Sequence, residues 1–350
     1  MKGVDEMGLT GADIFAGIHC GKAISFENMA VAPLIRNEDD PKGLEYLILR
    51  EAFEQDVLMV TETSEHGSVP ELAVRNTGKV PVLIIDGEEL SGAKQNRVVN
   101  TSILIPPETK LVVPVSCTEA GRWNYRSAVF CDSDIIMSSN IRAKKSRSVS
   151  ENLNFSSSFR SDQGEVWNEI EMEARAYGVH SPTAAMKDTL EKNRESVNQY
   201  TNKFRYVEGQ VGCLVFLNGK PAGFEMLSRP EKYAMLHEKI LRSYGISKLR
   251  IMQNVDYIDY SVSQKEFESA ISGIMAIDAA CFPSVGLGED CRLRQGKIAG
   301  SALRYEEETI HGAVFWLDDE IKKEKRREGI YVIDDEMAPY RERRDRAAHE

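Results

Sequence analysis

Between residues 57 and 116 the chain consists of short apolar runs of β type that follow one another closely. These runs span residues 57–63, 69–76, 80–85, 102–105 and 111–115. Turn residues separate them, and the segment Asn76-Thr77-Gly78-Lys79 predicts a hairpin turn between two of the runs. Strands at such close spacing favour a β-sandwich or an open barrel for this part of the chain.

The second half of the chain mixes helical and β patterns. Apolar residues at helical spacing predict helices at residues 165–177, 182–204, 228–244 and 263–280. Ser263 and Glu266 form a capping box at the start of the last helix, and Gly245 is expected to end the helix before it. Asn218-Gly219 between two apolar runs predicts a β-hairpin. Further strands are predicted at residues 292–293, 298–305 and 310–317.

The predicted fold class is therefore α+β, with a β-rich, sandwich-like layer at residues 24–137 and a mixed helix and strand half at 162–317. The helices alone leave the late strands without an obvious core. We therefore expect these strands to complete one sheet system with the first half, so that the two halves form one integrated unit.

Two segments have a different composition. Residues 138–161 are rich in Ser, Arg, Lys and Asn, which predicts a long loop or linker. Its basic residues form either a surface that faces an anion or a solvated connector, and they are Arg142, Lys144, Lys145 and Arg147. Residues 318–350 are highly charged and predict a surface helix or a frayed tail.

Charge and cysteine usage narrow the functional classes. The formal net charge of −11 does not favour a diffuse basic surface for nucleic acid. No apolar run approaches the roughly 18 residues that a membrane span needs, and we see no signal peptide. The six cysteines are scattered without a CxxC pair, so we expect no metal site, free thiols and a cytoplasmic location.

Lys94-Gln95-Asn96-Arg97 is a dense polar run between β segments, so it is expected at a strand end or in a loop. Two cations and two amides can bind a phosphate together with a base or ribose edge. The alternative is a structural network in which these side chains pair with Glu88, Glu89 or Glu119.

A second cluster, Arg122-Trp123-x-Tyr125-Arg126, offers an aromatic platform between two guanidinium groups. Such a platform suits the stacking of an adenine with contacts to its phosphates. The alternative is that Trp123 fills the core and the arginines bridge to acids.

The remaining candidates give weaker patterns. Glu88 and Glu89 point to opposite faces of a strand, so only a pairing of one of them with Glu119 or Asp86 would place two carboxylates together for hydrolysis. His311 is either structural or a base with Ser301 as its nucleophile. Cys117 is interpreted as a buried thiol.

Several longer stretches resemble a known family. They read DGEELSGAKQNRVVNTSILIPP, PVSCTEAGRWNYRS, FRSDQGEVW, VFLNGKPAGFEML and RPEKYAMLHEKILRSY. Over residues 24–317 they are similar to a family of prokaryotic proteins named for its gene neighbours, the ARG and rhodanese-phosphatase-superfamily-associated proteins. Those neighbours include ADP-ribosylglycohydrolases, so the resemblance implies a link to ADP-ribose or NAD metabolism. It carries over no catalytic residue.

We therefore predict a protein that binds a small-molecule or nucleotide-type ligand, with a non-enzymatic scaffold or assembly protein as the alternative. The candidate ligand-binding residues are Glu89, Lys94, Gln95, Asn96, Arg97, Asn100, Glu119, Arg122, Trp123, Arg126 and His311. The sequence leaves open whether the chain is an enzyme, which cofactor it uses and whether it forms a homo-oligomer. A structure separates the two hypotheses, because a ligand site requires the cations to converge on one place.

Overall fold

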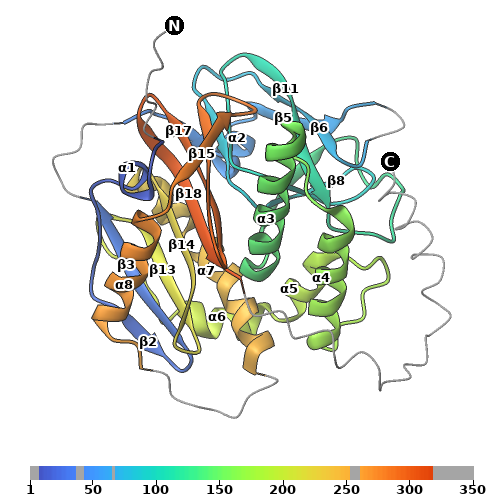
Figure 1. The fold of residues 1–350 in the computed structure, drawn as a ribbon. Coiled ribbons are helices and arrows are strands. Elements are labelled where there is room, and N and C mark those ends of the chain that lie inside the picture. Colours follow the sequence, from blue (N-terminus) through green and yellow to red (C-terminus); the bar gives the residue numbers. More distant parts are fainter. Residues whose placement is uncertain (1–7, 37–42, 65–67, 253–260, 318–350) are drawn as a thin grey trace, which may run out of the picture.

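The computed structural model describes residues 8–36, 43–64, 68–252 and 261–317, and it has an α+β fold with three β-sheets (Figure 1). The predicted fold class is therefore confirmed. The strands of the largest sheet are β1 (Ile18–Cys20), β2 (Ile24–Phe26), β3 (Met29–Arg36), β13 (Gln210–Leu217), β14 (Lys220–Leu227), β15 (Ala279–Pro283), β16 (Glu289–Gln295), β17 (Ile298–Tyr305) and β18 (Glu308–Trp316). The predicted charged tail lies outside the described residues.

This nine-stranded sheet joins strands from both ends of the chain. Its order is β1-β3-β13-β14-β18-β17-β16-β15, with β2 paired to β3, and every pairing is antiparallel. The β13–β14 connection is the predicted hairpin, and Asn218 and Gly219 both have the positive φ angles that its tight turn requires. The late strands thus share a sheet with β1 to β3, as the sequence predicted, but the other strands of the first half lie in separate sheets and do not join it.

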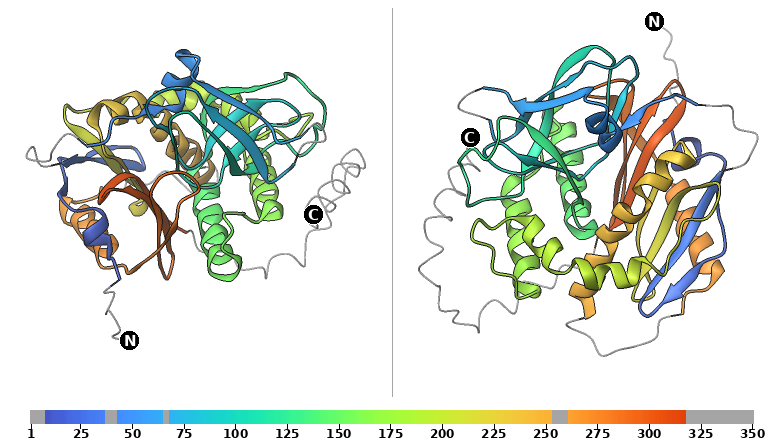
Figure 2. Two further views of the ribbon diagram at one scale, coloured as in Figure 1. Left: turned by 90° about the horizontal axis from the view of Figure 1, so that it is seen from above. Right: turned by 180° about the vertical axis from the view of Figure 1, so that it is seen from behind.

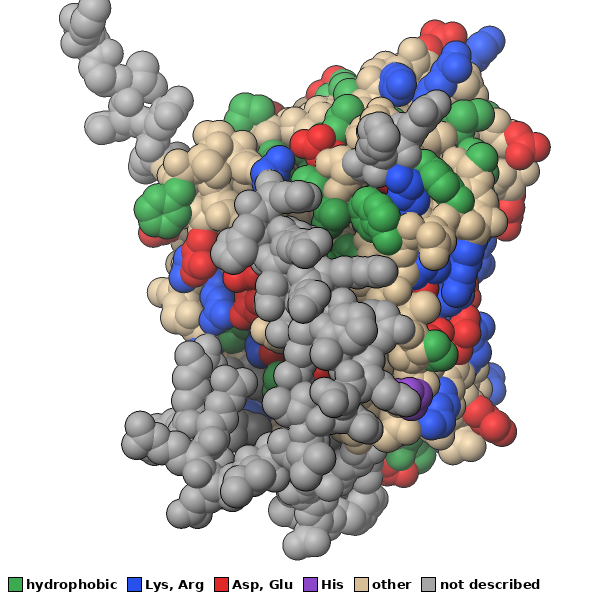
Figure 3. Space-filling model, turned by 90° about the vertical axis from the view of Figure 1, so that its right-hand side faces the viewer, with side chains coloured by type: hydrophobic (Ala, Val, Ile, Leu, Met, Phe, Trp, Pro, Cys, Tyr) green, Lys and Arg blue, Asp and Glu red, His purple; other side chains and the backbone are tan. Residues whose placement is uncertain are grey.

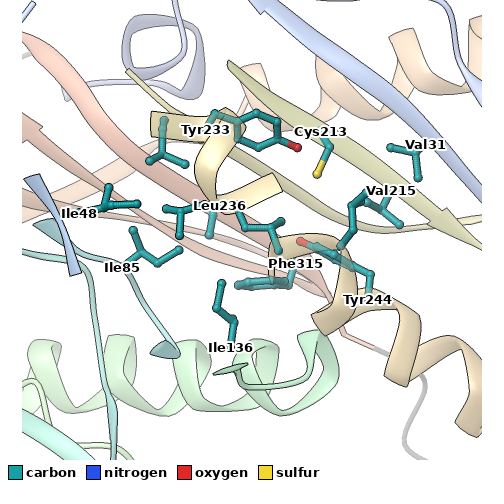
Figure 4. Close-up of a cluster of buried hydrophobic side chains, with 14 of the residues drawn as sticks. Val31, Ile48, Ile85, Ile136, Cys213, Val215, Tyr233, Leu236, Tyr244 and Phe315 are labelled. Atoms are coloured by element: carbon teal, nitrogen blue, oxygen red, sulfur yellow. The ribbon is translucent and has the colours of Figure 1, made fainter. Parts of the chain in front are cut away.

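Helices cover both faces of this sheet (Figure 2). On one face α7 (Pro230–Met252) packs against β13, and the helix contributes Tyr233, Leu236 and Tyr244 to the core shown in Figure 4. On the other face α1 (Gly11–Ile14) and α8 (Gln264–Met275) cover a second core. Successive side chains of a strand point to opposite faces of the sheet, so each strand contributes residues to both cores.

The other two sheets build the β-rich half. The six-stranded sheet has the order β12-β8-β9-β11-β6-β5, and the three-stranded sheet has the order β10-β7-β4. Their strands are β4 (Leu47–Ile48), β5 (Leu58–Glu62), β6 (Glu71–Asn76), β7 (Val82–Ile84), β8 (Glu88–Gly92), β9 (Arg97–Val99), β10 (Ile103–Ile105), β11 (Thr109–Cys117) and β12 (Phe130–Ile136). Apolar side chains from both sheets and from α2 (Leu49–Glu54) share one core.

The predicted hairpin at Asn76 is wrong, because β6 and β7 lie in different sheets. The side chain of Asn76 explains the change of direction. Its amide nitrogen donates to the carbonyl oxygens of Val80 and Pro106, and its oxygen accepts from the backbone of Gly78. These bonds turn the chain out of the six-stranded sheet instead of back along β6.

Residues 138–161 are not the predicted loop, because α3 spans Ser139–Ser156. The helix is largely buried although it carries few apolar residues, since its cations pair with acids of neighbouring elements. Lys144 and Arg147 pair with Glu169 and Glu165 of α4 (Gln163–Ala176), at 2.5 and 3.0 Å. A helix that packs mainly through ion pairs has no clear apolar stripe, and this stripe is the pattern by which a sequence reveals a helix.

Arg142 of α3 is the centre of a buried ionic cluster that links the sheets. Its Nη1 and Nη2 donate to the two carboxylate oxygens of Glu225 on β14 at 2.9 and 2.8 Å, and Nε lies 3.3 Å from Asp86. Lys145 also pairs with Asp86. Burial alone would raise the pKa of Glu225, but Arg142 and then His311 outweigh it and lower that pKa to about 2.

Two smaller expectations about helices need correction. The single helix predicted over residues 182–204 is two helices, α5 (Met186–Lys192) and α6 (Arg194–Thr201). Gly245 does not end α7 but lies within it, where a β-carbon would come within 3.0 Å of Val197 on α6.

The expectation of free thiols is wrong for two cysteines. Cys281 and Cys291 form a disulfide, because the β15–β16 register places them opposite each other. The other four cysteines are free thiols.

Substitution of Arg142 by Met should lower the free energy of unfolding by about 3–5 kcal/mol, because it leaves Asp86 and Glu225 buried without their partner. Urea unfolding followed by circular dichroism measures the loss. Arg147→Met is the matched control on the same helix, and its partly exposed pair with Glu165 should contribute less than about 1 kcal/mol. Equal effects of the two substitutions would contradict a central role for Arg142.

Candidate functional site

The predicted run from Lys94 to Arg97 lies in the turn between β8 and β9, with Arg97 as the first residue of β9. The prediction that it lies at a strand end or in a loop is confirmed. All four side chains are nevertheless buried, and Asn96 and Arg97 have no exposed surface. Polar groups removed from water to this extent need partners, so their hydrogen bonds show what the turn is built for.

Arg122 fastens this turn to the segment after β11. Its Nη2 lies 2.7 Å from Oε2 of Glu119, and its Nη1 donates to the carbonyl oxygen of Ala93 at 2.6 Å. Thr183 donates to the other oxygen of Glu119. Burial raises the pKa of Glu119, but Arg122 and Thr183 together outweigh it, so the net shift is downward. Glu119 and Arg122 therefore form the structural network that was the alternative for these residues.

Gln95 is held in one orientation by its neighbours. Its Nε2 donates to the carbonyl oxygen of Glu119 at 2.8 Å, so its Oε1 faces the opposite way. There Oε1 accepts from Nη1 of Arg97 at 2.9 Å and from the thiol of Cys117 at 3.0 Å. Burial raises the pKa of the Cys117 thiol, although Arg97 acts against this effect. The predicted buried thiol is thus confirmed.

Arg97 has two unused donors, more than any other buried arginine of the described residues. It stands opposite Cys117 in the β9–β11 ladder, and its Nε and Nη2 have no hydrogen-bond partner among the described residues. No carboxylate in the described part of the chain lies within ion-pair distance of it. Nε and Nη2 form the side of the guanidinium that grips two oxygens of a carboxylate or phosphate.

The loop after Arg122 places aromatic rings against the cations of this turn, and Trp123 is the ring in contact with Arg97. The ring of Trp123 lies 5.7 Å from Cζ of Arg97 and 5.4 Å from Nζ of Lys94, which also approaches Tyr125 at 5.1 Å. Trp123 is 37% exposed, so the alternative that it fills the core is wrong. Arg126 is more than half exposed and lies 3.7 Å from Glu119. We call Lys94, Gln95, Asn96, Arg97, Arg122 and Trp123 the Arg97 site.

Glu89 lies on the other face of the sheet. It pairs with Val98 across the β8–β9 ladder, whereas Leu90 pairs with Arg97. Thr118 donates to one carboxylate oxygen of Glu89 at 2.7 Å, and the other oxygen is buried without a partner among the described residues. Burial raises its pKa to about 7. Glu88 faces away from it and contacts Lys239, so the two acids do not act as a pair.

Asn100 and His311 lie outside the Arg97 site. Asn100 bonds to Ser116 and to the carbonyl oxygen of Phe159. His311 joins the ionic cluster around Arg142, where Nδ1 lies 2.7 Å from Ser102 and Nε2 lies 3.3 Å from Glu225. This order of groups resembles a catalytic triad, but Ser102 is 2% exposed and already accepts from the backbone of Asp86. Burial and an existing hydrogen bond do not favour Ser102 as a nucleophile.

Sequence reasoning missed the ionic cluster of Asp86, Arg142, Lys145 and Glu225. Only the cations gave a signal in the sequence, and that signal was interpreted as a surface.

Among the described residues no group of three His, Cys, Asp or Glu side chains could hold a metal ion. A small pocket between β12 and α5 to α7 has room for about one water molecule, and none of the predicted site residues lines it.

Charges are mixed on the face of the protein that Figure 3 shows. Figure 3 shows one face of the protein, where basic and acidic side chains are interspersed over the part that the structure describes. No helix of the described part is long and apolar enough to cross a membrane.

The chain belongs to the family of ARG and Rhodanese-Phosphatase-superfamily-associated Protein domains, whose model matches residues 17–315. The match covers the described part of the chain almost completely and includes the Arg97 site. No curated protein and no solved structure is significantly similar to the chain. The family name records an association with other proteins and assigns no ligand to any residue.

Glu89→Gln should make the protein more stable at pH 8 but not at pH 5. The folded-state pKa of about 7 lies above the ordinary 4.5, so folding favours the protonated acid, and wild-type stability falls as the pH rises from about 4.5 to 7. The neutral amide avoids this loss, which amounts to roughly 3 kcal/mol at most. Urea unfolding at both pH values measures the difference, and an equal effect at pH 5 and pH 8 would contradict it.

Proposed function

We propose that this member of the family binds a small nucleotide-type metabolite at the Arg97 site. Arg97 takes an oxyanion of the ligand through Nε and Nη2, and the exposed rings of Trp123 and Tyr125 accept its flat part. The observation that supports this function is the buried guanidinium of Arg97, whose two donors have no partner in the described protein.

A buried cation without an anion is unfavourable, which is why the unused donors point to a ligand. Leaving one buried donor unsatisfied costs about 1–3 kcal/mol, and more for a charged group. The same site contains two further buried donors without partners among the described residues, Nδ2 of Asn96 and Nε of Arg122. An excess of donors in one place favours a ligand that is rich in oxygen acceptors, as phosphates are.

The ion pairs of the site also limit which of its arginines can bind the ligand. Arg122 and Arg126 lie near Glu119 of the same segment, at 2.7 and 3.7 Å. Their charge is therefore used inside the chain, as the scaffold hypothesis expected. That hypothesis does not account for Arg97, which has two donors without a partner and no acid within ion-pair distance among the described residues, whereas Arg122 pairs with Glu119 and Arg142 with Glu225. The Arg97 donors thus favour the ligand-binding hypothesis.

The nature of the ligand is proposed from chemistry and association together. A guanidinium beside two exposed aromatic rings suits a phosphate joined to a base. The family name links these proteins to ARG proteins, which agrees with an ADP-ribose or NAD-related ligand. We assign no catalytic step, because Glu89 lies on the opposite face of the sheet from Arg97.

Arg97→Met should stabilise the ligand-free protein and abolish ligand binding. The substitution removes an uncompensated buried charge, so we expect the free energy of unfolding to rise by about 1–3 kcal/mol. A thermal-shift screen against ADP-ribose, NAD, AMP and inorganic phosphate measures both effects. A ligand at a hundred times its dissociation constant stabilises wild-type protein by about 2.7 kcal/mol, and the variant should show no such shift.

Arg126→Met is the control, because this more exposed arginine lies beside the site without being buried in it. It should keep most of the ligand-induced shift. If Arg97→Met destabilises the protein, or if none of these ligands shifts wild-type protein, the nucleotide function is wrong. A search for a protein partner by pull-down would then test the scaffold alternative.

A further inference from the structure

Trp123 is a partly exposed side chain that lies against Arg97, whereas the hydrogen-bond partners of Arg97 among the described residues are buried. Arg97 has no exposed surface, whereas the indole ring that lies against it is 37% exposed. The route from solvent to Nε and Nη2 that these contacts indicate therefore runs past this ring, and an anion that takes it moves the ring aside. The way in which the ring is held decides how easily this happens.

The backbone on both sides of Trp123 is anchored. Gly121 donates to the carbonyl oxygen of Thr183 at 2.8 Å, and Arg126 donates to that of Ala93 at 2.9 Å. Trp123 itself makes no hydrogen bond within the described residues, and its ring makes cation–π contacts with Lys94 and Arg97. Rotation of this side chain therefore breaks no hydrogen bond of the described residues, but it gives up the two cation–π contacts and the packing of the covered part of the ring.

We infer that Trp123 is a specificity gate, which admits anions that carry a flat ring and excludes bare anions. This inference rests on the proposed function. A bare phosphate satisfies Arg97 but leaves the displaced indole without a replacement for its lost contacts. A nucleotide supplies both groups, because its phosphate satisfies Arg97 and its base stacks on the displaced ring.

The gate also explains why Lys94 and Arg97 share one ring. Both cations lie between 5 and 6 Å from the centroid of Trp123, so its electron-rich face stabilises two like charges in a buried place. Tyr125 adds a second ring next to Lys94 and stays more than half exposed. In the closed state the indole thus partly substitutes for the missing anion.

The test compares AMP with inorganic phosphate on wild-type protein, Trp123→Ala and Trp123→Phe by isothermal titration calorimetry. Wild-type protein should bind AMP at least tenfold more tightly than phosphate. Trp123→Ala should bind phosphate about tenfold more tightly than wild-type protein does and AMP more weakly, so the preference for AMP is lost. Trp123→Phe keeps a ring and should retain most of the preference.

An independent readout is the reaction of Arg97 with an arginine-selective dicarbonyl reagent, followed by peptide mass spectrometry. Arg97 should be protected in wild-type protein and modified in Trp123→Ala, while the exposed Arg126 reacts in both. Unfolding midpoints identify any variant that has lost its fold, in which case Trp123→Phe and Trp123→Leu replace the alanine variant.

The outcomes separate the gate from the proposed function. If Trp123→Ala binds both ligands with the wild-type preference, or if Arg97 reacts equally in both proteins, Trp123 is not a gate and the ligand site stands. If neither protein binds AMP or phosphate, the proposed function fails and the gate fails with it. If only the alanine variant binds phosphate, the gate stands and the nucleotide assignment is wrong.

Discussion

The bidentate pair between Arg142 and Glu225 holds together the parts on which the rest of the structure depends. Arg142 belongs to α3, Glu225 to the nine-stranded sheet, and Asp86 to the connection that leads into β8. One guanidinium therefore joins a helix to two sheets in a place where all three side chains are buried. Because a buried charge without its partner is strongly unfavourable, this cluster tolerates only one arrangement of the three elements.

Two buried arginines in this protein, Arg142 and Arg97, differ in how many of their guanidinium nitrogens have hydrogen-bond partners. All three nitrogens of Arg142 bond to carboxylates, whereas Arg97 uses one nitrogen and leaves two without partners in the described structure. The arrangement of Arg142 stabilises the fold and leaves no nitrogen of its guanidinium without a partner for a ligand to bind. The arrangement of Arg97 lowers stability in the free protein, and a bound oxyanion would reverse that loss. This contrast, more than the number of cations, locates the candidate site.

Much of the candidate site was visible in the sequence as two polar clusters, and the structure brings both clusters together around the β8–β9 turn. The sequence could not show which cations already have an acidic partner. The ion pair between Glu119 and Arg122, for example, depends on how the backbone of the loop between them is folded. Asn100 and His311 were also candidate ligand-binding residues but lie elsewhere. Their partners, Ser116 and Glu225, come from strands whose neighbours no local pattern specifies.

Local physical chemistry by itself determined the elements of this protein: the β-hairpin at Asn218-Gly219, the capping box at Ser263 and the short strands all follow from backbone preference and side-chain period. Only the tertiary structure decided which sheet each strand joins, that Ser139–Ser156 is a largely buried helix, and that Arg97 has no acidic partner among the described residues. The reason is the range of the interactions. Turns and caps form between residues close in sequence, whereas the charges that bury α3 come together only when distant strands meet.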